Sequence, residues 1–157
     1  MTAIEVTDVV LLNEHKEGNL TIRKYQVNSG SLHPKDVFNF INVLISSEAF
    51  SKVQLRYQNR ENFYIVTVTK IKNGLEICSK IFTEELVREH ENKNIHAYER
   101  EGYLVNRRYH IKSNSLMEAS NHLSEFYKWD NKEVAWEWLL PVHEIAKGEE
   151  LVFVLEK

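Results

Sequence analysis

The sequence predicts an α+β fold in which about three helices accompany a mainly antiparallel sheet. Several segments alternate apolar and polar residues, as half-buried strands do, two others repeat apolar residues with helical spacing, and a third begins like a helix. Short loops join the successive strand segments, which favours antiparallel pairing. The chain has 157 residues, the length of about one domain. We therefore expect a single domain over residues 1–157 with the order ββ-α-βββ-α-ββ-α-ββ.

The first half of the chain predicts two strand groups separated by a helix. The charged and glycine-containing segment 15–19 has loop chemistry, and Pro34 suits the first turn of a helix. Asn73-Gly74 is the strongest short-range signal for a hairpin. The expected elements are strands at 4–12 and 20–27, a helix at 34–47, and strands at 53–57, 63–71 and 75–82.

The second half predicts two further helices and two further strand pairs. Thr83 and the acids after it resemble a helix start. Ser115 and Glu118 have the spacing of a capping box ahead of a third helix. The expected elements are a helix from Thr83 that ends by 92–94, a hairpin over 95–112, a helix at 116–129, and strands at 134–140 and 151–155. The helix at 116–129 has an apolar stripe formed by Leu116, Ala119, Leu123, Phe126 and Tyr127.

Composition narrows the class of protein. Apolar residues make up 43% and charged residues 27% of the chain, which is typical of a soluble globular protein. A formal net charge of −3 provides no global field that would hold nucleic acid. The single Cys78 excludes an internal disulfide and favours a reducing, cytoplasmic setting. Neither a secretory signal nor an apolar run of about 18 residues is present, so we expect no membrane association.

Known catalytic and cofactor motifs are missing from the sequence. The five glycines are too widely separated for a phosphate-binding loop or a dinucleotide fingerprint. No pair of the seven histidines has the spacing that places two metal ligands on one face of a helix or strand. A Gly-x-Ser-x-Gly motif is also absent. We therefore expect no cofactor, no metal and no catalytic residue, which argues against an enzyme without excluding one.

The segment 95–112 is the most informative candidate for a functional surface. Alternation along the predicted strand places Arg108 and His110 on one face, where arginine can bind phosphate or carboxylate and histidine can move a proton. Tyr109 and Ile111 then point toward the core. Arg107 shares their face, so it must extend along apolar surface or pair with an acid such as Glu99.

Aromatic residues add further candidates. Tyr98 lies beside the cationic segment, where a base could stack on it. Trp136 and Trp138 alternate along the strand expected at 134–140, so they share a face. Large aromatics of this kind are usually buried, whereas an exposed tryptophan pair would anchor an interface.

Two classes of function remain open. The first is a non-enzymatic binding module that acts through protein–protein contacts, as an inhibitor, immunity or accessory protein, and in its simplest form as a homodimer. The frequent Asn, Lys, Ile and Glu residues favour a bacterial or phage origin. The alternative is a nucleic-acid or nucleotide-phosphate binding protein, with a phosphodiesterase as its enzymatic form, that uses Arg107, Arg108 and His110. A plain solvated sheet face is the third interpretation of these residues.

Overall fold

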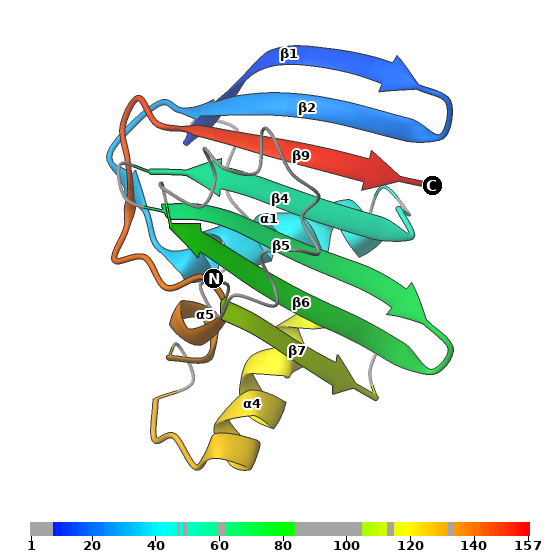
Figure 1. Ribbon diagram of the computed structural model, residues 1–157, viewed down its shortest axis with the longest axis vertical. Coiled ribbons are helices and arrows are strands. Elements are labelled where there is room, and N and C mark those ends of the chain that lie inside the picture. Colours follow the sequence, from blue (N-terminus) through cyan, green and yellow to red (C-terminus); the bar gives the residue numbers. More distant parts are fainter. Residues whose placement is uncertain are drawn as a thin grey trace.

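The computed structural model describes residues 8–46, 48, 50–59, 62–83, 105–112, 115–131 and 134–157. Its main feature is a seven-stranded antiparallel sheet with the strand order β1-β2-β9-β4-β5-β6-β7 (Figure 1). The expected α+β class is confirmed. The strands are β1 (Val9–Glu17), β2 (Leu20–Val27), β4 (Lys52–Gln58), β5 (Asn62–Ile71), β6 (Gly74–Thr83), β7 (Val105–Ile111) and β9 (Glu150–Glu156).

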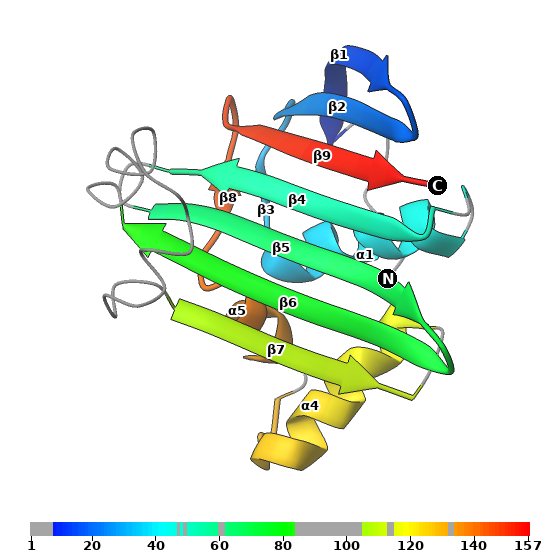
Figure 2. The same ribbon diagram turned by 45° about the vertical axis from the view of Figure 1, so that its right-hand side comes forward.

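Among the described residues, the helices all lie on one face of this sheet, as both ribbon views show, and we call the opposite face the open face (Figures 1 and 2). A separate two-stranded ribbon pairs β3 (Ser31–Leu32) with β8 (Ile145–Ala146). The helices are α1 (Pro34–Ser46), the single 3₁₀ turn η1 (Leu116–Glu118), α4 (Ala119–Tyr127) and α5 (Val134–Leu139).

The hydrophobic core lies between the sheet and the helices. Alternate residues of the central strands are fully buried, among them Leu55 of β4, Val66 of β5 and Phe153 of β9. Helix α1 supplies the opposite side of the core, because its apolar residues recur with helical spacing. Its buried apolar side chains are Pro34, Val37, Phe38, Ile41, Leu44 and Ile45.

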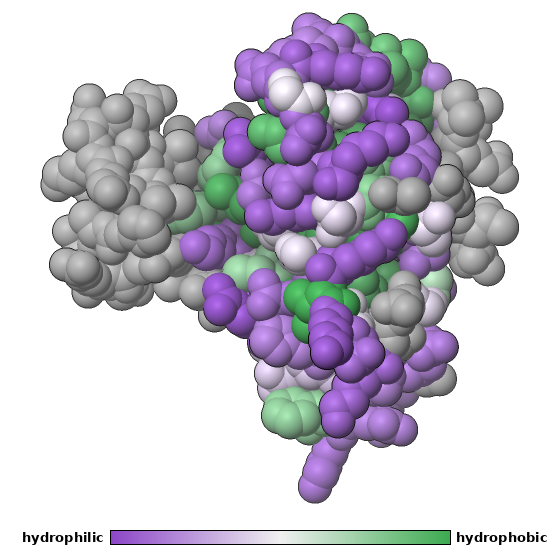
Figure 3. Space-filling view, turned by 90° about the vertical axis from the view of Figure 1, so that its right-hand side faces the viewer, coloured by the Kyte–Doolittle hydropathy of each residue, from purple (hydrophilic) through white to green (hydrophobic). Residues whose placement is uncertain are grey.

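The open face is mainly polar, as half-buried sheets require on the side that meets water. The residues that alternate with the buried ones are half-buried or exposed along β4, β5 and β9. Figure 3 shows a face of the molecule on which hydrophilic side chains predominate and hydrophobic ones form only separate small areas.

The Asn73-Gly74 turn joins β5 to β6, and its glycine lies against the end of β7. Asn73 has a left-handed backbone (φ 65°), which asparagine tolerates better than most residues. Gly74 is required for space: a Cβ atom there would lie 1.9 Å from the carbonyl oxygen of Ile111. The hairpin predicted from these two residues is confirmed. Because Gly74 has no side chain, the end of β7 can approach β6 closely.

The strand predicted at 134–140 is wrong, because Val134–Leu139 forms helix α5. The segment Val134-Ala-Trp-Glu-Trp-Leu-Leu is apolar at nearly every position, so it fits both an alternating and a helical pattern. The helical pattern holds in the structure, since Ala135, Trp136, Leu139 and Leu140 are buried. Trp136 and Trp138 therefore do not share a strand face.

Two local predictions need smaller corrections. Ser115 precedes η1 but makes no capping hydrogen bond through its side chain, so the capping box is wrong. The loop expected at 15–19 is shorter, because β1 continues to Glu17, which pairs with Leu20. The β1 strand lies at the sheet edge, and both of its faces are largely exposed. Its polar end therefore lacks the alternation of apolar and polar residues by which a strand is predicted.

The remaining elements divide into confirmed and untested ones. The strands at 20–27, 53–57, 63–71, 75–82 and 151–155 and the helices at 34–47 and 116–129 all have counterparts in β2, β4, β5, β6, β9, α1 and η1 with α4. The helix from Thr83 to 92–94 and the first arm of the 95–112 hairpin lie outside the described residues.

Candidate functional site

A continuous set of aromatic rings lies where β7, α4 and α5 meet. The Tyr127 ring is central: its centroid is 4.9 Å from those of Phe126, Trp129 and Trp138. Phe126 in turn lies 6.3 Å from Tyr109 on β7, within the range of edge-to-face attraction. We call this set with Arg107 the aromatic surface. Its members are Arg107, Tyr109, Phe126, Tyr127, Trp129 and Trp138.

The end of α4 explains why these rings gather. Lys128 adopts a left-handed backbone (φ 58°), and its N–H donates to the carbonyls of Ser124 and Glu125. The Trp129 N–H donates to the Ser124 carbonyl at 2.8 Å. Such a C-terminal cap reverses the chain direction. It places Trp129 against Tyr127, with ring planes only 18° apart.

Arg107 is fixed within the aromatic surface by Trp138. Its guanidinium lies over the indole ring, 4.8 Å from the centroid, and donates a hydrogen bond to the Trp138 carbonyl. Partial burial lowers the pKa of Arg107, because the charged form is partly removed from water. No acid among the described residues pairs with Arg107. Arg107 was expected either to extend along apolar surface or to pair with an acid, and in the structure it stacks on an aromatic ring.

Two rings of this surface, Phe126 and Tyr127, are exposed, whereas Tyr109, Trp129 and Trp138 are partly buried against the core. Phe126 is 69% exposed and Tyr127 39% exposed, although both belong to the apolar stripe expected to face inward. Leu116, Ala119 and Leu123 of the same stripe are fully buried. Leu123 is therefore the last buried apolar residue of α4, with Ser124 buried next to it, and Phe126 and Tyr127 at the end of the helix present their rings to solvent.

The strand register predicted for β7 is confirmed. Arg108 and His110 are exposed, Ile111 is buried, and Tyr109 is half-buried against the core. Arg108 and His110 therefore lie on the open face, opposite the face of Arg107. The partner of His110 is Glu76 on β6, with 2.7 Å between His110 Nε2 and Glu76 Oε2.

The other predicted site residues lie in different places. Trp136 lies in the core, stacked on Phe38 at a centroid distance of 4.5 Å, so it cannot anchor an interface. Trp138 is half-buried and belongs to the aromatic surface. Tyr98 and Glu99 lie outside the described residues.

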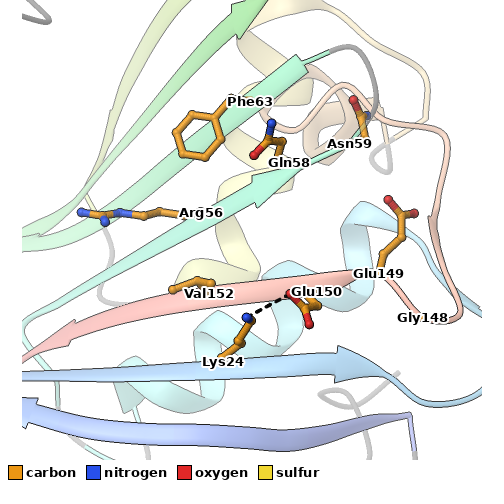
Figure 4. A pocket seen from close by; sticks show the side chains of 9 residues that line it. All are labelled: Lys24, Arg56, Gln58, Asn59, Phe63, Gly148, Glu149, Glu150 and Val152. Atoms are coloured by element: carbon orange, nitrogen blue, oxygen red, sulfur yellow. Dashed lines mark ion pairs between the residues drawn. The ribbon is translucent and has the colours of Figure 1, made fainter. Parts of the chain in front are cut away.

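A second candidate is a trough on the open face, with a volume of about 800 Å³ (Figure 4). Its acidic members are already engaged: Glu149 accepts hydrogen bonds from the Tyr57 hydroxyl and the Ala146 N–H, and Glu150 pairs with Lys24 at 3.2 Å. The lining residues are Lys24, Arg56, Gln58, Asn59, Phe63, Gly148, Glu149, Glu150 and Val152.

Sequence reasoning missed both the exposed rings and the trough. Phe126 and Tyr127 carry helical spacing that is equally suited to burial, so only the position where α4 leaves the core reveals them. The trough depends on β9 lying between β2 and β4, which brings Lys24 and Arg56 to either side of Val152. No local pattern carries that information.

Neither a metal site nor a membrane-spanning helix is found in the described part of the chain. No group of three or more His, Cys, Asp or Glu side chains there has the arrangement of a metal site. Among the same residues, every helix falls short of the length and apolar character needed to cross a bilayer.

Comparison with known proteins adds no family. No family model matches the chain, and neither a curated protein nor a solved structure matches it. A functional assignment therefore depends on the surfaces of this molecule.

Proposed function

We propose that this chain is a non-enzymatic protein-binding module whose contact region is the aromatic surface. The supporting observation is the 69% exposure of Phe126 at the outer end of a connected set of rings. Single exposed apolar residues are common on proteins and need no explanation. An exposed ring that continues into Tyr127, Trp129 and Trp138 is a larger patch of the kind found at interaction sites.

The residue types in this surface are those that dominate binding energy at interfaces. Trp, Tyr and Arg are enriched among residues whose truncation costs about 2 kcal/mol or more of affinity. Here these side chains are held before any partner arrives, because Trp138 contacts both Arg107 and Tyr127. Less side-chain entropy is then lost on binding than for freely rotating side chains.

The module fits an inhibitor, immunity or accessory protein that acts by occupying a partner. A second copy of the chain is the simplest partner, since a self-complementary patch gives a twofold dimer. The single Cys78 and the residue usage agree with a cytoplasmic protein of bacterial or phage origin.

Affinity purification with matched variants tests this function. The bait is the full chain in three forms: wild type, Phe126→Ala and Ile71→Ala. Ile71 is also an exposed apolar residue, 39% accessible, but it lies at the β5–β6 turn away from the aromatic surface. We expect wild type and Ile71→Ala to retain the same partner, and Phe126→Ala to retain at least about tenfold less.

Light scattering on the purified chain distinguishes an external partner from a second copy. If the wild type has a mass of 18.6 kDa, it is a single chain, and the partner retained in the purification is a different protein. Twice that mass, reduced to a single chain by Phe126→Ala, indicates self-association through the same surface. Equal partner retention by all three baits, or a dimer unaffected by Phe126→Ala, would contradict the proposal.

A further inference from the structure

The open face carries a band of residues whose charged members lie between β2 and β7, across six strands. The register aligns two neighbouring rows of side chains across the sheet, and we call these two rows the basic band. One row runs from β1 to β6 through Asn13, Lys24, Val152, Arg56, Ile65 and Lys80. The next runs through His15, Ile22, Val154, Gln54, Thr67, Cys78 and Arg108.

The charge of the band is opposite to that of the chain. Its fixed charges are all positive: Lys24, Arg56, Lys80 and Arg108. None of its residues is acidic, although the chain as a whole has a formal net charge of −3. Acidic residues of the open face lie in the rows on either side, as do Glu150 and Glu76. A local positive potential therefore crosses the sheet.

The band is hollowed rather than flat. A hollow of about 200 Å³ is lined only by band residues, namely Asn13, His15, Ile22, Lys24 and Val152. The trough of about 800 Å³ adjoins it and shares Lys24 and Val152. Arg56 and Phe63 project from the neighbouring strands β4 and β5 at the border of this trough (Figure 4).

The geometry points to a single-stranded nucleic acid bound along the basic band. Lys24, Arg56 and Lys80 stand two strands apart from one another, a spacing of about 10 Å, so one isolated phosphate reaches only one of them. From β2 to β7 the band extends over about 24 Å. A chain with repeated phosphates matches this arrangement, and about four nucleotides are the smallest site of this type.

Neighbouring residues favour nucleic acid over an acidic peptide. Phe63 is half-buried on the open face opposite Gln58, and its ring lines the trough. A base that enters the trough can stack on this ring. The amide of Gln58 in the same lining offers donors and an acceptor to base edges. Val152 and Ile65 separate the cations with apolar surface that suits sugar and base rather than carboxylate.

The cations are oriented for exchange with phosphate. The Nε of Arg56 donates to Gln54 Oε1 at 2.8 Å, which orients the guanidinium and leaves its two outer nitrogens for a ligand. Lys24 pairs with Glu150 at 3.2 Å, but both side chains are 43% exposed. An exposed pair of this kind is worth at most about 1 kcal/mol, so phosphate can replace the carboxylate.

Fluorescence anisotropy with a labelled 12-nucleotide oligothymidine tests this inference on the full chain. We expect binding at low salt that weakens about 50-fold for a fourfold increase in NaCl, as about four phosphate contacts to a single strand predict. Duplex DNA of the same length and polyglutamate serve as competitors. Both are expected to displace the oligonucleotide only at more than about tenfold higher concentration, because neither offers exposed bases for stacking.

Matched variants locate the site. Arg56→Gln is expected to weaken binding severalfold and to make the salt dependence shallower by about one phosphate contact. Lys52→Gln removes the same charge from the same strand and face but outside the band, and is expected to leave affinity within twofold. Phe63→Leu keeps apolar volume and is expected to weaken oligonucleotide binding at least fivefold through lost stacking.

Several results would overturn the inference. Absence of binding at low salt would do so, as would equal losses for Arg56→Gln and Lys52→Gln. Polyglutamate competing as well as oligothymidine, with no effect of Phe63→Leu, would identify an acidic protein segment as the ligand instead. Arg108→Gln is a second band variant at an exposed position, so a folding defect in one variant leaves the other to decide.

Discussion

The guanidinium of Arg107 lies 4.8 Å from the centre of the Trp138 ring and donates a hydrogen bond to the Trp138 carbonyl. This contact joins β7 to α5, two elements that are remote in sequence and lie on different layers. It also fixes two of the six side chains that form the aromatic surface. The same contact therefore contributes to stability and to the proposed binding function.

Replacement of Arg107 by alanine should destabilise the protein by about 1–3 kcal/mol, from the loss of a cation–π contact and a charged hydrogen bond. Arg108→Ala is the matched control, because the neighbouring residue is exposed on the other face. Its effect should stay within about 0.5 kcal/mol. Urea unfolding of both variants gives the comparison, and similar losses would contradict the role assigned to Arg107.

Tyr57 should make stability fall at high pH. Burial, and next the hydrogen bond to Glu149, raise the pKa of Tyr57 above its ordinary value. An unfolded tyrosine deprotonates near pH ~10, whereas the folded state keeps this proton to higher pH. The folded state then binds more protons than the unfolded state, so the free energy of unfolding decreases as pH rises past about 10.

The variant Tyr57→Phe isolates this contribution. Its free energy of unfolding should decline less steeply than that of the wild type above pH ~10, while below that pH the two curves run parallel. Tyr25 and Tyr109 also have raised pKa values, mainly through burial, so part of the decline remains. Urea unfolding across this pH range checks the slopes, and identical slopes would rule out a titrating Tyr57.

Trp136→Ala should destabilise the protein by about 3–5 kcal/mol, because it removes a fully packed ring from the core. Trp136 is 2% exposed and stacks on Phe38. Phe126→Ala, which truncates a ring that is 69% exposed, should cost less than about 1 kcal/mol. Thermal unfolding of the two variants separates core from surface, and a reversal of this order would refute the assignment of both residues.

Gly74→Ala should destabilise the protein by more than about 2 kcal/mol, since its Cβ would displace backbone. The oxygen of Ile111 is only 1.9 Å from that position. Gly30→Ala is the comparison: it has open space but a left-handed backbone (φ 60°), and should cost about 1–2 kcal/mol. A smaller loss for Gly74→Ala than for Gly30→Ala would show that β7 can move away from β6.

The local pattern of apolar and polar residues was sufficient to predict most strands of the sheet. Residues of β4, β5 and β9 alternate because helices cover only one face, and the Asn73-Gly74 turn fixes a hairpin by its own backbone preference. The same alternation placed Arg108 and His110 on the open face. Helix α5 was misread because its residues are nearly all apolar, so period alone could not distinguish it from a strand.

Long-range order was not predictable in the same way. Strand β9 comes last in the chain but lies between β2 and β4, and only this insertion aligns Lys24 with Arg56 across Val152. The aromatic surface likewise depends on where α4 leaves the core, at Leu123, rather than on the spacing of its apolar residues. Both candidate sites arise from contacts between segments remote in sequence.

Site-specific photocrosslinking tests the proposed binding function most directly. A photoreactive phenylalanine analogue is placed at residue 126 or, as the control, at residue 71, in cells that produce the protein. Both positions are exposed and apolar in the native chain. The account predicts a covalent adduct with one protein, or with a second copy of the chain, from residue 126 and none from residue 71. Equal crosslinking from both positions, or none from residue 126, would contradict it.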